Sequence, residues 1–189
     1  MSGRSEWASP GALGLAGFGL TTVLLNLHNV GLVEVPLITF CYGFFYGGLA
    51  QVIAGIIDGR RGDIFGLTAF TSYGLFWIGL SLAILLDWLK IVTLTPVEAG
   101  YVMLMWGIFT AYLTPGSFKI TRFALPTVFI SLTILFFLLS AAFFMIASGG
   151  SILLLRIAGI EGIFCGLSAM YTSAGIVLNT HLGKEVLPL

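Results

Sequence analysis

The sequence predicts an all-α integral membrane protein with six transmembrane helices. Of its 189 residues, 58% are hydrophobic and 8% are charged, whereas soluble proteins carry about 25% charged residues. The apolar residues gather into six long runs, and nearly all charged residues lie in the short segments between them. Because a helix needs about 20 mostly apolar residues to cross a bilayer core of roughly 30 Å, these runs predict membrane spans.

The breaks between the runs fix the order of the predicted spans. Charged residues and glycine–proline pairs mark these breaks, and the segment from Asp58 to Asp63 is the most highly charged of them. A proline near the start of a run favours a helix that begins there, because its missing N–H has no partner in the first turn. The expected spans are residues 13–33, 36–57, 65–86, 99–113, 125–147 and 152–179.

The distribution of Lys and Arg predicts the orientation of the chain. With six spans, both termini and the loops after the second and fourth spans share one side. That side holds Arg4, Arg60, Arg61, Lys119, Arg122 and Lys184, and the other holds Lys90 and Arg156. Because cytoplasmic loops are enriched in basic residues, we expect a multi-pass protein of the inner (plasma) membrane. Residues 1–12 and 180–189 then form cytoplasmic segments that flank a transmembrane domain of residues 13–179.

Several classes of function lack support in the sequence. No basic run is present of the kind that binds phosphates, so we expect no nucleic-acid partner. Metalloprotease, hydrolase and P-loop signatures are missing, and so is a Cys/His cluster with metal-ligand spacing. We therefore expect no enzyme, no cofactor and no metal, and membrane lipid is the expected surrounding partner.

Polar residues inside the predicted spans are candidates for a solute pathway. Thr22, Asn26 and Asn29 recur on one face of the first span, at positions i, i+4 and i+7. Polar groups at this depth either bridge neighbouring helices or line water, and the sequence leaves both alternatives open. The candidate polar lining comprises Thr22, Asn26, Asn29, Gln51, Thr71 and Ser72.

Two titratable residues are candidates for sensing pH. His28 lies near the outer end of the first span, and an unperturbed histidine titrates near about 6.5. A structural hydrogen bond is the alternative role for this side chain. Glu161 is the carboxylate expected inside a span, where an acid is a functional candidate by default. Its alternative role is an ion pair with Arg156 near the membrane interface.

Four sequence blocks follow one another at residues 9–18, 21–29, 45–51 and 65–74. They read SPGALGLAGF, TTVLLNLHN, FYGGLAQ and FGLTAFTSYG. These blocks resemble those of the succinate–acetate permease family, also called the acetate uptake transporter family, and the resemblance extends over nearly the entire chain. The chain departs from the family pattern at Ser9 and Ala12, where the family has Asn and Pro, and at Glu161, where it has Trp.

The resemblance implies a six-helix protomer in a cyclic homohexamer, with one substrate pathway through each protomer. The architecture would be similar to that of the acid-gated urea channels. The family's narrow hydrophobic constriction corresponds to Phe18, Tyr73 and Leu132, which contribute one bulky side chain each from the first, third and fifth predicted spans. The Tyr73 hydroxyl would be a potential donor to a passing carboxylate.

Three functions are compatible with these features. The leading hypothesis is transport of acetate and related small carboxylates such as succinate, through an anion channel or a proton-coupled permease. The first alternative is a channel for urea or another small neutral amide, because the same polar residues suit a neutral solute and no fixed cation selects anions. The second alternative is a membrane assembly or sensor protein that transports nothing.

Overall fold

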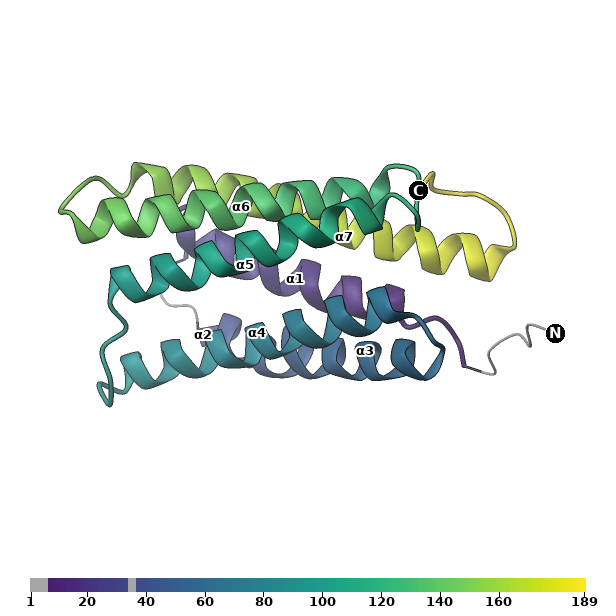
Figure 1. Cartoon of the computed structure of the whole chain (residues 1–189), viewed down its shortest axis with the longest axis horizontal. Helices are drawn as coiled ribbons and strands as arrows, with labels where there is room; N and C mark the ends of the chain where they lie inside the picture. The colour runs from purple at the N-terminus through teal and green to yellow at the C-terminus, as the bar shows by residue number, and fades with distance from the viewer. Residues whose placement is uncertain (1–6, 34–36) are drawn as a thin grey trace.

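The computed structural model describes residues 7–33 and 37–189, and these ranges contain helices and no strands (Figure 1). Residues 37–60 form three consecutive helical segments without a break, which together make one rod. The described chain therefore folds into six rods, which confirms the predicted fold class. The elements are α1 (Gly11–Asn29), α2 (Leu37–Phe44), the π-helical segment η1 (Phe45–Ala50), α3 (Gln51–Arg60), α4 (Ile64–Trp88), α5 (Pro96–Ser117), α6 (Ala124–Ala147) and α7 (Leu153–Leu182).

Five helical stretches in the described ranges are long and apolar enough to cross a membrane. They are Gly11–Asn29, Phe40–Arg60, Ile64–Trp88, Ala124–Ala147 and Leu153–Leu182. The sixth rod, α5, has 22 residues and packs along α6. It is not among these five stretches, although its length suits a crossing.

The structure departs from the prediction within the second span. The second span was expected as one regular helix, but η1 widens the backbone at Phe45–Ala50. Gly47 and Gly48 lie in this segment, and their missing side chains let it approach Thr21 of α1 and Ile78 of α4. The expected start of that span at Pro36 lies outside the described residues.

The fourth helix is longer than the predicted span of residues 99–113. Its start is fixed by a capping box, in which the Thr95 hydroxyl accepts from the Glu98 backbone N–H and the Glu98 carboxylate accepts from the Thr95 N–H. The helix continues past the expected end at residue 113 and includes Pro115. A proline in a last turn removes one backbone hydrogen bond, and the helix continues only to Ser117.

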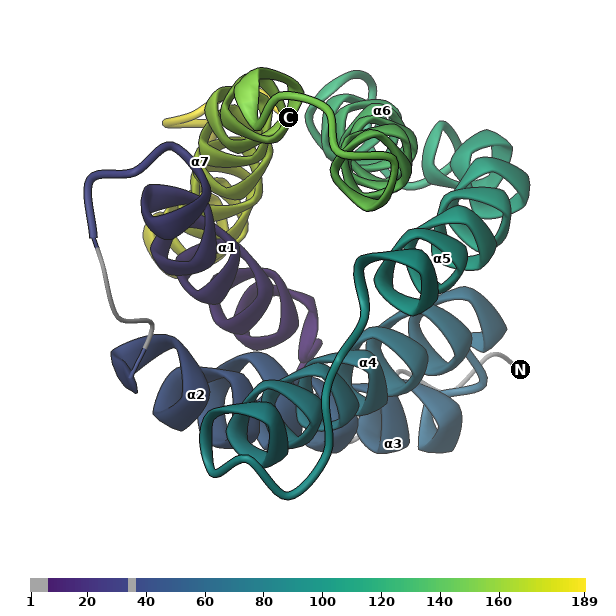
Figure 2. The ribbon, with the colours of Figure 1, turned by 90° about the vertical axis from the view of Figure 1, so that its left-hand side faces the viewer.

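The rods surround a central axis when the molecule is seen end-on (Figure 2). In this ring α1 packs on α7, α7 on α6, α6 on α5, and α3 on α4, whereas α4 and α5 are neighbours with few close contacts. The start of α1 and the C-terminus lie at the same end of the bundle (Figure 1). This agrees with an even number of crossings.

The C-terminal residues fold back onto α7. The Asn179 side chain accepts from the backbone N–H groups of Val186 and Leu187 and donates to the Leu187 carbonyl. The Leu189 side chain lies against Gly175, and its carbonyl accepts from the Arg122 N–H. The tail therefore joins α7 to the connection between α5 and α6.

Two glycines form the closest backbone contact between α1 and α7. A Cβ atom built on Gly166 would lie 2.6 Å from the Gly19 carbonyl oxygen, and a Cβ on Gly19 would lie 2.6 Å from the Gly166 carbonyl oxygen. Small residues allow such approach in membranes, where van der Waals packing takes over from the hydrophobic effect.

We expect Gly166→Ala to destabilise the protein by about 1–3 kcal/mol, the usual cost of overpacking, because the new methyl group meets backbone. Gly79→Ala is the matched control, since nothing lies within 4 Å of its added Cβ. Thermal unfolding in detergent should show a lower midpoint for Gly166→Ala and an unchanged or higher one for Gly79→Ala. Equal midpoints for the two variants would contradict the close crossing.

Candidate functional site

Two cavities open from opposite ends of the bundle. The first, of about 120 Å³, lies at the end that holds the start of α1 and the connection between α3 and α4. The second, of about 740 Å³, lies at the end that holds His28 and the start of α5. Helices α1, α4, α6 and α7 contribute to both linings, so the two cavities follow the same central axis.

Aromatic side chains separate the two cavities. Phe18 and Tyr73 line the first cavity, Phe76 and Trp106 line the second, and no described residue lines both. The Tyr73 ring centroid lies 6.1 Å from that of Phe18 and 5.8 Å from that of Trp106, and the Phe76 and Trp106 centroids are 4.9 Å apart. We call these four residues the aromatic partition.

The structure places the three predicted constriction residues in the lining of one cavity. Phe18 from α1, Tyr73 from α4 and Leu132 from α6 all line the first cavity, and the rings of Phe18 and Tyr73 belong to the aromatic partition. Each of the three is at most 5% exposed. Their role as the constriction is a proposal.

The Tyr73 hydroxyl lies 2.9 Å from the Thr110 hydroxyl of α5. Thr110 is fully buried, and its own hydroxyl donates to the Trp106 carbonyl oxygen at 2.8 Å. The sequence carries no signal for this contact, because threonine in a helix commonly bonds back to its own backbone. Thr110 is thus a site residue that sequence reasoning missed.

The predicted polar lining divides into two groups. Gln51 lines the first cavity, and Asn29 and Ser72 line the second. Thr22, Asn26 and Thr71 line neither cavity. Among the described residues, polar side chains therefore border the pathway on both sides of the aromatic partition.

The polar face of α1 forms a chain of hydrogen bonds. The Thr22 hydroxyl donates to the Phe18 carbonyl, the Asn26 amide donates to the Thr22 carbonyl, and the Asn29 amide donates to the Asn26 side-chain oxygen at 3.0 Å. Asn26 is 1% exposed and packs directly over Gly162 of α7. The chain thus leads from the helix contact with α7 to the second cavity at Asn29.

The two titratable candidates lie in different surroundings. His28 lines the second cavity, and its Nδ1 atom lies 2.8 Å from the Val33 carbonyl oxygen. Glu161 is half-buried, accepts a hydrogen bond from Ser131 of α6, and lines neither cavity. Its second carboxylate oxygen is buried without a hydrogen-bond partner among the described residues, and the structure records no ion pair with Arg156.

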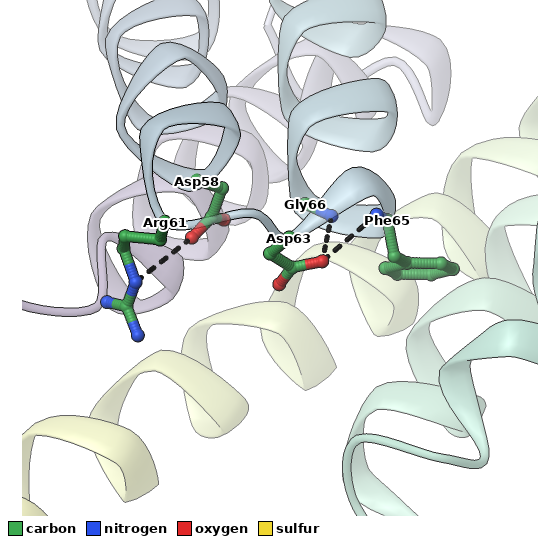
Figure 3. A network of polar contacts seen from close by, with 5 residues as sticks. All are labelled: Asp58, Arg61, Asp63, Phe65 and Gly66. Atoms are coloured by element: carbon green, nitrogen blue, oxygen red, sulfur yellow. Dashed lines mark hydrogen bonds and ion pairs between the residues drawn. The ribbon is translucent and has the colours of Figure 1, made fainter. Parts of the chain in front are cut away.

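Two carboxylates, Asp58 and Asp63, border the first cavity, and Figure 3 shows their polar contacts. Asp63 caps α4 by accepting from the backbone N–H groups of Phe65 and Gly66, each at 3.0 Å. Asp58 is 4% exposed, and its Oδ1 atom lies 3.9 Å from the Arg61 Nε atom. This segment is the most highly charged break of the sequence, and the structure buries its Asp58 beside the cavity with Arg61 as the ion-pair partner.

Fold and cavities together define a helical membrane protein with an interrupted path along its axis. The chain belongs to the GPR1/FUN34/yaaH family, whose model matches residues 2–185. It is 43% identical over 188 residues to the succinate-acetate/proton symporter SatP of Escherichia coli (strain K12), covering 99% of this chain and 97% of that protein.

A solved structure and a yeast protein extend the comparison. The structure of the bacterial acetate channel SatP superposes with a TM-score of 0.90 at 43% identity, and covers 97% of this chain and 99% of that chain. The ammonia transport outward protein 2 of Saccharomyces cerevisiae is 33% identical over 186 residues, which are 93% of this chain and 64% of that protein.

We expect Thr71→Val to stabilise the protein by roughly 1 kcal/mol. The Thr71 hydroxyl is buried against Gly55 of α3 without a hydrogen-bond partner among the described residues, and an unsatisfied buried hydroxyl costs about 1–3 kcal/mol. Thermal unfolding in detergent is the measurement. Thr71→Ser keeps the hydroxyl and should not stabilise. A lower midpoint for Thr71→Val would place this residue on a solvated pathway instead.

Proposed function

We propose that this protein transports acetate and related small carboxylates, such as succinate, across the membrane. The observation that carries the proposal is the pair of coaxial cavities closed off from each other by the aromatic partition. This arrangement suits a small solute that crosses one short apolar layer between two wider mouths. The similarity to SatP, a named succinate-acetate/proton symporter, supports the substrate class.

Charge favours passage of the carboxylic acid together with its proton. No Lys or Arg is among the described residues that line either cavity, and Asp58 and Asp63 border the first. An ionised carboxylate is costly in an apolar layer unless a partner compensates it. Gln51, Asn29 and Ser72 offer hydrogen bonds to a neutral acid on both sides of the aromatic partition, so proton-coupled transport is the form that the site supports.

Phe18, Tyr73 and Leu132 set the size limit for the solute in this proposal. Their side chains come from three different rods and all line the first cavity. The polar residues then act in two ways. Gln51, Asn29 and Ser72 replace part of the water that the solute loses, whereas Thr22 and Asn26 hydrogen-bond within α1 and Thr71 packs against Gly55 of α3.

A channel for small neutral solutes is the second candidate. The lack of a fixed cation along the cavities favours it, and so does the name of the yeast relative, which describes ammonia transport. Urea or a small amide would use the same polar side chains. A membrane assembly or sensor protein without transport is the remaining alternative.

Uptake into liposomes that contain the purified full chain distinguishes these functions. We expect labelled acetate to enter faster than in empty liposomes, and urea to enter at the rate of empty liposomes. The protein-dependent acetate rate should rise as external pH falls from about 7 to 5, because carboxyl groups titrate near pH 4 and more acid is then protonated. A rate that stays flat supports an anion channel. Selective urea entry supports the second candidate, and no entry supports the third.

We further propose a homohexamer in the inner (plasma) membrane with both termini cytoplasmic and one pathway in each protomer. The excess of basic residues at the end that holds the start of α1 and the C-terminus supports the orientation, and the family resemblance supports the hexamer. Native mass spectrometry in mild detergent should record six chains, and reporter fusions at both ends should report the cytoplasm. Monomers alone, or ends on opposite sides, would contradict these assignments.

A further inference from the structure

Thr110 connects two helices whose backbones make few close contacts. Helices α4 and α5 are neighbours in the ring, and Trp106 of α5 packs on the rings of Tyr73 and Phe76. The hydrogen bond between Tyr73 and Thr110 is the one side-chain hydrogen bond that the described residues of these two helices make with each other. Because Tyr73 lines the first cavity, this bond is the directional link between the two helices beside the pathway.

The number of hydroxyl protons determines which residue donates in the hydrogen bond between Tyr73 and Thr110. A threonine hydroxyl has one proton to donate, and Thr110 donates it to the Trp106 carbonyl oxygen at 2.8 Å. The Tyr73 O–H must then donate to the Thr110 oxygen, 2.9 Å away. The phenol proton therefore points to α5 and is not free for a carboxylate in the first cavity.

Ring packing and the hydrogen bond constrain Tyr73 in different ways. The ring lies between Phe18, Trp106 and Phe109, with centroids at 6.1, 5.8 and 5.6 Å. Such ring contacts tolerate a range of offsets and tilts. The hydrogen bond is directional and joins the tip of the ring to a fully buried oxygen on α5, so it fixes how far the ring extends between Phe18 and Leu132.

We propose that Thr110 is a positioning residue for the constriction, which holds the Tyr73 ring in place and keeps its phenol proton away from the solute. The proposal rests on the proposed function, in which Phe18, Tyr73 and Leu132 set the size limit. Tyr73 then acts as a wall that excludes larger solutes and not as a donor that binds the carboxylate.

The test compares lactate and acetate uptake into liposomes that contain the full chain. Thr110→Val keeps the side-chain shape without the hydroxyl, and Tyr73→Phe removes the donor from the other side. We expect each to raise the lactate-to-acetate ratio by roughly two- to tenfold, the range for loss of one hydrogen bond. The double variant should match the single variants, because all three lack the same bond.

Three further variants separate positioning from a general loss of stability. Thr110→Ser keeps a hydroxyl and should restore the wild-type ratio. Thr114→Val changes the same residue type one turn along α5, where the hydroxyl lies 3.3 Å from that of Thr133 on α6, and should also keep the wild-type ratio. Leu132→Ala widens the constriction from α6 and should raise the ratio irrespective of Thr110.

Each outcome bears on one claim. A raised ratio in Leu132→Ala with a wild-type ratio in Thr110→Val overturns the role of Thr110 and leaves the constriction in place. A lower acetate rate in Tyr73→Phe at an unchanged lactate-to-acetate ratio also overturns the role of Thr110, because the Tyr73 hydroxyl would then bind the solute. A wild-type ratio in Leu132→Ala, or no protein-dependent acetate uptake, contradicts the proposed function itself. If Thr110→Val does not fold, the lactate-to-acetate ratios of Tyr73→Phe and Thr110→Ser test the role of Thr110 instead.

Discussion

The close packing of α1 is the constraint on which the rest of the bundle depends. Gly14 lies against the Phe70 ring of α4, Gly17 against the Tyr46 carbonyl of η1, and Gly19 against the backbone of α7 at Gly166. A side chain at any of these positions would push a different neighbour away. Phe18 lies among these three glycines, so the contacts that hold α1 also set the depth at which its ring meets Tyr73.

Hydropathy and charge sufficed to predict six rods, because each rod must bury its backbone polar groups in lipid by forming a continuous helix. The ring of Phe18, Tyr73 and Leu132 came from family resemblance, since nothing in composition or spacing tells which apolar side chains meet. The π-helical segment and the long α5 were missed. The first depends on local contacts of Gly47 and Gly48, and the second on a capping box that precedes the apolar run.

Polar residues were predicted as a set, but their directions were not. Thr71 and Ser72 are adjacent, yet Thr71 faces Gly55 of α3 and Ser72 faces the second cavity. Side chains of adjacent residues point about 100° apart around a helix axis. A span that is apolar nearly all round has no distinct hydrophobic face, so the sequence does not show in which direction each polar side chain points. Thr110 was missed for the same reason, because only the fold shows that its hydroxyl meets a residue 37 positions earlier.

In the proposed function, different parts of this structure select the size and the charge of the solute. The constriction has bulky apolar or aromatic side chains whose one hydroxyl is directed to Thr110, so it would discriminate by shape. The mouth of the first cavity holds Asp58, which pairs with Arg61, and Asp63, which caps α4, and no Lys or Arg is among the described residues that line this cavity. An ionised solute would lose its water at the aromatic partition without gaining a cation there, whereas a protonated one loses far less. In this proposal, selection for the protonated form does not need a titrating gate, because the solute's own carboxyl group would carry the proton across.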